Sequence, residues 1–261
     1  MTSAIEQHYH ARTRHEGEFG NLVYPLDQVR VDLQGLRADY DRVSAAHPDW
    51  TPQDRKKVGK TNWTGISLYS LNGRADDMRC SSYPITKPTP AAEYCPHIMN
   101  ELLPQLGIGS LLRVAFYRVD AGTGVGRHRD WEMGRANGVV RIHVPIVTNE
   151  QAIMFNNGRW YHMPAGQAWY FDTSSIHAVE NGGDEHRIHL AVDVRVGKET
   201  SHLFKRVQAS DRIRFVYVRG RTFWKRVRAF ASLVWSDDGR RRIAESLRVR
   251  ARALRAKLGP G

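Results

Sequence analysis

Hydrophobic and polar residues alternate with the two-residue period of a β-strand through the middle of the chain, or gather in short apolar runs. The predicted strands are residues 63–71, 111–119, 139–147, 168–172 and 186–196. The Asn157-Gly158 pair within 152–163 is a strong tight-turn signal, so that segment is predicted to form a hairpin. Residues 63–196 therefore indicate short strands with almost no helix, which is typical of a β-sandwich, barrel or jelly roll.

Helical patterns flank this region. Apolar residues recur at helical spacing at Val29, Leu33, Leu36 and Tyr40. A short helix is predicted from about Pro96 to Leu106. After Gly197, residues 222–235 and 241–258 are amphipathic and predict two helices. We therefore expect a mainly β domain with an N-terminal helical part over 1–199, followed by a helical extension over 200–261.

The amino-acid composition indicates which class of protein this is. Of 261 residues, 41% are hydrophobic and 25% charged, which is ordinary for a globular protein. No run approaches the roughly 18 apolar residues of a membrane span, and the first 19 residues lack the apolar core of a secretion signal. Two cysteines, Cys80 and Cys95, cannot build a disulfide framework and are expected to be reduced. These features predict a cytoplasmic protein.

The net charge of +12 is concentrated at the C-terminal end. From Lys205 onward there are 17 basic and four acidic residues, a formal charge of +13. The preceding 204 residues hold 22 bases and 23 acids, a charge of −1. The extension, which is basic as well as amphipathic, fits an acidic carrier protein or an anionic membrane surface. Packing on the barrel or a homodimer contact is the simpler alternative, and nucleic acid is a less favoured one.

Candidate chemistry begins with His128 and Asp130 in the segment GRHRDWE. On a strand, residues i and i+2 project from one face, so this pair could take adjacent positions on a divalent metal. His177, 49 residues further on, could supply a third ligand. Two histidines and one carboxylate are typical of non-haem iron(II) oxygenases and leave open positions for a keto acid and dioxygen. The alternative is that all three are ordinary surface and turn residues.

Arg187 follows His177 by ten residues, on the predicted strand 186–196. If that strand lies beside the metal, the Arg187 guanidinium points into the same cavity and could pair with the far carboxylate of a dicarboxylic acid. An exposed strand arginine is the alternative.

These residues lie in motifs that resemble the aspartyl/asparaginyl β-hydroxylase family. The resemblance spans about residues 60–196, and the motifs occur in the family's order and spacing. It is carried by WTGISLYSLNG, TPAAEYCPHI, LLRVAFYRVDAGTGVGRHRDWE, VRIHVPIVTN and WYHMPAGQAWYFDTSSIHAVENGGDEHRIHLAVD. It implies a double-stranded β-helix (jelly roll, cupin-like) and a requirement for Fe(II), 2-oxoglutarate and dioxygen.

The resemblance also implies roles for single residues. His128, Asp130 and His177 would bind the metal, and Arg187 would bind the C5 carboxylate of 2-oxoglutarate. Some animal members lack the carboxylate ligand, whereas Asp130 is present here. This chain therefore looks closer to bacterial members, some of which hydroxylate free amino acids such as proline. A carboxylate ligand leaves no position for chloride, which favours hydroxylation over halogenation.

Further side chains could line the same cavity. Arg141 and His143 share a face of strand 139–147 and, by the resemblance, would contact 2-oxoglutarate or the substrate carboxylate. Arg113 and Tyr117 share a face of strand 111–119, and either could face the pocket. Trp131 could wall the substrate site or simply pack. The remaining histidines considered are expected to be structural: His162, His186 and His189.

The sequence thus predicts a dioxygenase that hydroxylates an unactivated C–H of an amino acid, or of an amino-acid unit in a peptide or natural product. The alternative is a jelly-roll metal-sensing protein that binds nucleic acid through its basic extension. A nucleic-acid demethylase is disfavoured because the basic charge lies far from the motif.

Overall fold

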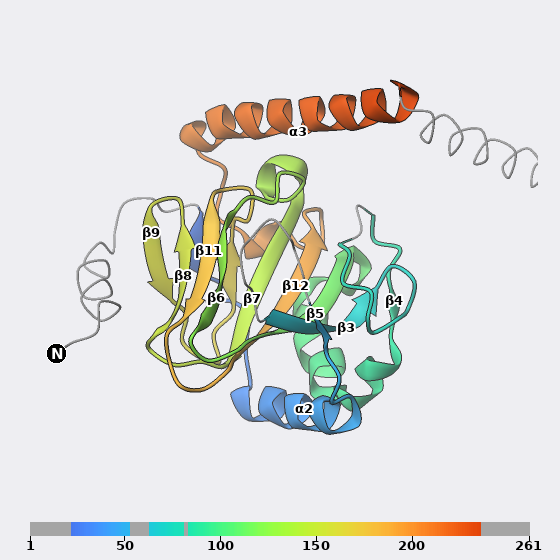
Figure 1. Ribbon diagram of the computed structural model, residues 1–261, viewed down its shortest axis with the longest axis vertical. Coiled ribbons are helices and arrows are strands. Elements are labelled where there is room, and N and C mark those ends of the chain that lie inside the picture. Colours follow the sequence, from blue (N-terminus) through green and yellow to red (C-terminus); the bar gives the residue numbers. More distant parts are fainter. Residues whose placement is uncertain (1–21, 53–62, 81–82, 236–261) are drawn as a thin grey trace, which may run out of the picture. The chain divides into compact units, whose positions relative to one another are not determined.

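The computed structural model describes residues 22–52, 63–80 and 83–235, whose strands form two antiparallel sheets (Figure 1). The larger sheet has the order β1 (Val23–Pro25), β10 (Trp169–Phe171), β7 (Val139–Val147), β12 (Arg187–Arg195), β5 (Leu111–Val119), β3 (Trp63–Ser70) and β2 (Thr51–Pro52), with β4 (Lys87–Pro88) paired to β3. The smaller sheet has the order β6 (Thr123–His128), β11 (His177–Asn181), β8 (Ala152–Asn156) and β9 (Arg159–His162).

From β5 to β12 the chain passes back and forth between the two sheets, except at the β8–β9 hairpin, whose strands share the smaller sheet. This winding gives the core strand orders β5-β12-β7-β10 and β6-β11-β8-β9. It is the topology of a double-stranded β-helix, so the predicted jelly roll is confirmed.

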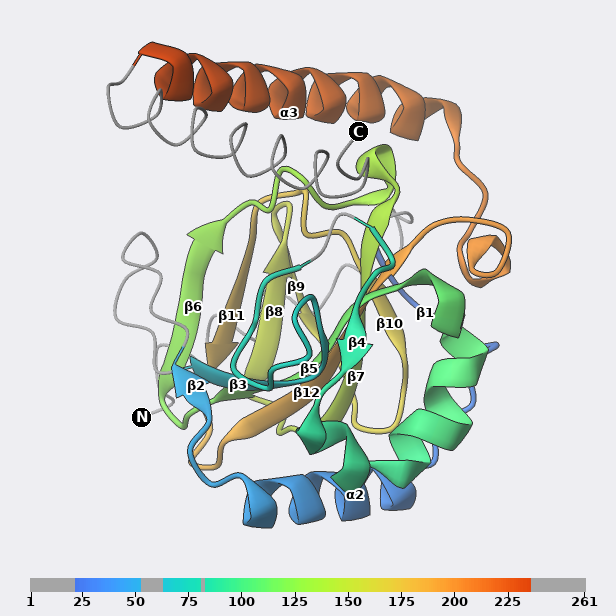
Figure 2. The same cartoon turned by 90° about the vertical axis from the view of Figure 1, so that its right-hand side faces the viewer.

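Alternation along the central strands separates the core from the barrel interior. On β12, Ile188, Leu190 and Val192 belong to the main hydrophobic core, together with Leu36 and Val43 of helix α2 (Leu33–Ala46). The intervening side chains of β12 point to the opposite face, toward the smaller sheet. Figures 1 and 2 show α2 on one side of the barrel. The odd-numbered residues of this strand are therefore the ones available to a site inside the barrel.

The predicted helices differ from the observed ones in detail. Helix α2 begins after Asp32, whose carboxylate accepts a hydrogen bond from the Gln34 N–H at 3.0 Å, so its start lies inside the expected pattern. Residues 98–106 are helical but irregular: a π-helical turn, Ile98–Leu102, is followed by a 3₁₀ turn, Leu103–Leu106. Pro104 lacks the N–H that a regular α-helix would require at this point.

The predicted strands are all present, and within the described residues five strands were missed: the short β1, β2 and β4, and two longer ones. The 152–163 hairpin is present, and both of its turn residues, Asn157 and Gly158, have positive φ angles of 47° and 98°. Strands β6 and β11 were not predicted. Asp130 also differs from expectation, because β6 ends at His128 and Asp130 lies in the following turn rather than on a strand.

The C-terminal extension contains helix α3 (Ala209–Trp235), which includes the predicted 222–235 helix and begins 13 residues earlier. The chain divides into two compact units, residues 1–215 and 216–261. The predicted helix 241–258 lies outside the described residues. In the ranges that the structure covers, no helix combines the length and apolarity needed to span a bilayer.

Candidate metal and co-substrate site

His128, Asp130 and His177 converge at one end of the smaller sheet. His128 is the last residue of β6 and His177 the first of β11, and the two are directly paired in the antiparallel register. Their ring centroids are 4.1 Å apart. One ligand atom from each of the three side chains lies within 4.8 Å of the others, so a single metal ion could contact all three. Residues separated by 49 positions in sequence are thus brought together by strand pairing.

Both imidazoles are oriented by backbone carbonyls. The Nδ1 of His128 lies 2.8 Å from the Gly126 carbonyl, and the Nδ1 of His177 lies 2.9 Å from the Ser175 carbonyl. Nδ1 therefore carries the proton and donates in each case, which leaves Nε2 with a lone pair for a metal. Burial, and then the neighbouring His128, lower the pKa of His177 to about 4. His177 is accordingly neutral, as a ligand must be.

The third member, Asp130, is fixed through its backbone. Its N–H donates to the Thr173 carbonyl at 2.9 Å. Its carboxylate oxygen Oδ2 lies 3.7 Å from Nη1 of Arg141. Two imidazoles and one carboxylate form the two-histidine, one-carboxylate set that suits ferrous iron. The donor chemistry of the residues therefore fits the predicted metal.

A short loop, Asp172–Ser175, supplies the carbonyls that hold both Asp130 and His177. Asp172 is buried and accepts hydrogen bonds from the Ser174 N–H at 2.9 Å and the Tyr170 hydroxyl at 3.1 Å. Arg214 at the start of α3 also pairs with Asp172 and donates to the Ser174 hydroxyl at 3.0 Å. The sequence reading missed this loop because its role is carried by main-chain atoms.

Arg187 is the first residue of β12, and its side chain is 2% exposed. Its Nη2 lies 3.1 Å from the sulfur of Met154 and 2.6 Å from Nδ1 of His189, while its Nε has no partner. Among the described residues no carboxylate pairs with it. Burial alone lowers the pKa of Arg187 to about 9. A buried guanidinium in this condition is suited to an anionic ligand that enters the barrel.

Arg187, His128 and His177 line one cavity of about 60 Å³ between the sheets. Arg141 and His143 also line it, as the family resemblance implied, and so does Tyr117, for which pocket and packing positions were both open. The other lining residues are mostly apolar: Trp63, Val119, Val125, Met154, Phe171, Thr173 and Val179. A candidate metal site and a buried guanidinium that line one cavity could bind the two ends of a keto dicarboxylic acid.

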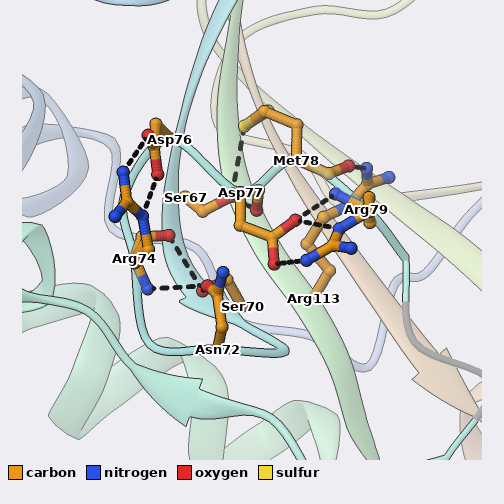
Figure 3. Close-up of polar contacts among 9 residues, drawn as sticks. All are labelled: Ser67, Ser70, Asn72, Arg74, Asp76, Asp77, Met78, Arg79 and Arg113. Carbon is orange, nitrogen blue, oxygen red and sulfur yellow. Dashed lines mark hydrogen bonds and ion pairs between the residues drawn. The ribbon is translucent and has the colours of Figure 1, made fainter. Parts of the chain in front are cut away.

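Arg141 is held by a buried ion-pair network that the sequence did not reveal. Its Nε donates to Oδ1 of Asp193 at 2.7 Å, and Nη2 of Arg113 donates to Oδ2 of the same carboxylate at 2.5 Å. Arg113 also donates to the Met78 carbonyl (Figure 3). Although burial opposes it, the two guanidinium groups hold the pKa of Asp193 far below its usual range. Asp193 thus fixes Arg141 beside Asp130, and a contact from Arg141 to a co-substrate stays a prediction.

The remaining candidate residues differ in whether they lie near Arg187 and the inner cavity. His143 is buried, its Nδ1 has no partner, and burial lowers its pKa well below the usual value. His189, expected to be structural, is the residue that contacts Arg187, and it too is held neutral by burial. His186 bonds the Tyr40 hydroxyl at 3.0 Å. Trp131 is not among the residues that line the inner cavity, and it lines a neighbouring hollow that shares His128 with it.

The strand order and the His-Asp-His cluster define a double-stranded β-helix protein with a candidate metal site of the two-histidine, one-carboxylate type. The chain belongs to the aspartyl/asparaginyl beta-hydroxylase family, whose model matches residues 30–196. The family resemblance predicted from the motifs is therefore confirmed.

The individual proteins that resemble this chain share low sequence identity with it. The chain is 26% identical over 173 residues to L-proline cis-3-hydroxylase 1 from Streptomyces sp., an alignment that covers 65% of this chain and 59% of that protein. The chain thus matches less than two thirds of that relative's length. Solved structures that resemble it include an oxidoreductase of the 2OG-Fe(II) oxygenase family from Burkholderia pseudomallei (10% identity, 61% of this chain, 78% of that chain, TM-score 0.41). Another is a Cupin 2 conserved barrel domain protein from Salinispora arenicola (21% identity, 35% and 68%, TM-score 0.25).

Proposed function

We propose that this protein is an iron(II)- and 2-oxoglutarate-dependent dioxygenase that hydroxylates an unactivated C–H of an amino acid or an amino-acid unit. The observation that carries the proposal is the buried guanidinium of Arg187, which lines the same cavity as His128 and His177 and has no carboxylate partner within the described ranges. Membership of a hydroxylase family and the similarity to a proline hydroxylase support it. When bound, iron(II) with 2-oxoglutarate and dioxygen would supply the oxidising power, releasing succinate and carbon dioxide.

In this proposal the protein binds, orients and excludes water. His128, Asp130 and His177 would hold the metal through two Nε2 atoms and a carboxylate, and Arg187 would bind the C5 carboxylate of 2-oxoglutarate. The apolar walls of the cavity, among them Val125 and Met154, would keep water from the reacting atoms. Because Asp130 occupies the third ligand position, hydroxylation is favoured over halogenation.

The test is formation of succinate from 2-oxoglutarate by the purified chain with iron(II) and ascorbate, stimulated by a panel of free amino acids and peptides. Asp130→Ala should lower this activity by at least about 100-fold, because the metal loses its anionic ligand. It should also weaken Mn(II) binding measured by calorimetry. Asp120→Ala is the matched control, since Asp120 is an exposed carboxylate paired with Arg118. Undiminished turnover and metal binding by the Asp130 variant would refute the ligand role.

A further inference from the structure

The inner cavity is small for two organic molecules. A water molecule needs roughly 10–15 Å³ of such volume, so about 60 Å³ holds on the order of five waters. That space suits one compact molecule such as 2-oxoglutarate. The molecule to be hydroxylated must then lie mainly outside this cavity, next to the metal ligands.

A second, larger hollow of about 400 Å³ adjoins the cluster of His128, Asp130 and His177, and it shares His128 with the inner cavity. It runs from the end of β6 to the turn between β8 and β9. We call this hollow the outer groove. Besides His128, its main lining residues are Arg127, Arg129, Trp131, Phe155 and Ile176. Arg127 and Arg129 line this hollow together with His128, a proposed metal ligand.

Each of these guanidinium groups lies over an aromatic ring. The Arg127 guanidinium carbon is 4.5 Å from the centroid of Phe155, and that of Arg129 is 5.0 Å from the centroid of Trp131. Within the described ranges neither arginine has an ion-pair partner, and the polar contact of Arg129 is the Ser174 carbonyl at 3.5 Å. A guanidinium stacked on a ring keeps its N–H edge available for bidentate pairing with an anion.

We propose that the outer groove is a substrate subsite for an acidic group, a carboxylate or a phosphate, covalently attached to the unit that is hydroxylated. This inference rests on the proposed function, because it places the substrate between the groove and the metal. Arg127 and Arg129 pair with the anion, while Trp131, Phe155 and Ile176 contact the flat or apolar part of the same molecule. The substrate is therefore larger than a free neutral amino acid and carries a negative charge away from the oxidised carbon.

Binding can be tested without turnover. The ¹⁵N–¹H signal of the Trp131 indole, assigned with Trp131→Phe, reports ligands in the groove. The probes are three N-acetylated, C-amidated peptides that differ only in the central side chain: Gly-Asp-Gly, Gly-Asn-Gly and Gly-phosphoserine-Gly. We expect the two acidic peptides to bind at least tenfold more tightly than the amide peptide, as judged by the dissociation constants obtained from the signal shift. The Arg127→Gln/Arg129→Gln double variant should lose this preference. The Arg30→Gln/Arg212→Gln variant, which removes two exposed charges elsewhere, should retain it.

The relative affinities of the two acidic peptides identify the anion, and a preference for either one supports the subsite. Equal shifts by the acidic and amide peptides, or unchanged binding by the Arg127/Arg129 double variant, would overturn it. Succinate release without any organic substrate provides the separate check on the proposed function. If that activity is present and stimulated fully by a free neutral amino acid in the double variant, the oxygenase assignment stands and the subsite fails.

Discussion

At the scale of single residues, Arg187 offers the most direct test of the proposed function. A buried cation without a carboxylate costs stability in the ligand-free protein and is compensated when an anion binds. Replacing it with the apolar side chain of similar length in Arg187→Met should leave the thermal midpoint of the ligand-free protein unchanged or raised. The same variant should bind 2-oxoglutarate about 100-fold more weakly in the Mn(II)-loaded, anaerobic protein.

Calorimetry measures this loss of affinity. Arg118→Met is the matched control, because Arg118 is a β5 arginine whose side chain is 45% exposed and paired with Asp120. Equal 2-oxoglutarate affinity in the Arg187 variant and this control would rule out the assigned anchor.

The lowered pKa of Arg187 also predicts a pH dependence. Burial lowers the pKa of Arg187 to about 9 in the folded protein, whereas the unfolded chain keeps the proton to a much higher pH. Between these values the unfolded state binds more protons, so the contribution of Arg187 to the free energy of unfolding rises with pH. The stability deficit of the wild type against Arg187→Met should therefore be full at pH 8 and smaller at pH 10, as measured by urea unfolding of the ligand-free proteins. A constant difference would contradict the lowered pKa.

Site residues could be predicted from the sequence where residue type and spacing along the chain indicate their role. The His128–Asp130 spacing, a distant His177 and a strand arginine were visible in the sequence. The same sequence gave no sign that Asp193 joins Arg113 to Arg141, because an acid in an apolar strand shows its partners only when three strands are paired. Asp130 was expected on a strand, and the structure instead holds it through a backbone bond to Thr173.

At the scale of elements, the loop 172–175 connects the start of α3 to Asp130 and His177, two of the proposed metal ligands. Arg214 compensates the charge of buried Asp172, and the loop carbonyls orient Asp130 and His177. Arg214→Gln should lower the free energy of unfolding by about 1–3 kcal/mol, because it leaves Asp172 less well compensated. It should also weaken Mn(II) binding. Arg212→Gln, an exposed neighbour on the same helix, is the control, and metal binding as weak in the control would refute the specific role.

Elements with strong alternation or a defined turn were predictable, and weakly patterned ones were not. The core strands β5, β7 and β12 are rich in apolar residues at strand spacing, and nearly all of their residues are buried. Strand β6 contains Gly124 and Gly126 and was taken as a turn. A Cβ on Gly124 would lie 2.4 Å from the Val179 carbonyl, so the glycine allows β6 to approach β11. That requirement is tertiary and leaves no periodic signal.

At the scale of the whole molecule, positive charge is concentrated in the second unit. Residues 216–261 contain 13 bases and three acids, a charge of +10, while residues 1–215 contain 26 bases and 24 acids, a charge of +2. The charge that makes the whole chain basic is thus separate in sequence from the His-Asp-His cluster. We propose that residues 216–261 recruit the enzyme to an anionic surface and take no part in catalysis.

The prediction compares the full chain with residues 1–215, which retain Arg214 and its pair with Asp172. The full chain should sediment with vesicles that contain phosphatidylserine at about 50 mM salt and be released at about 300 mM, because screening weakens interactions between exposed charges. The truncated chain should not sediment, yet should release succinate at the rate of the full chain with a small substrate. Loss of that activity would mean that residues 216–261 support the barrel itself. Equal sedimentation of both chains would place the attracting charge in residues 1–215, in contradiction to the distribution of bases along the sequence.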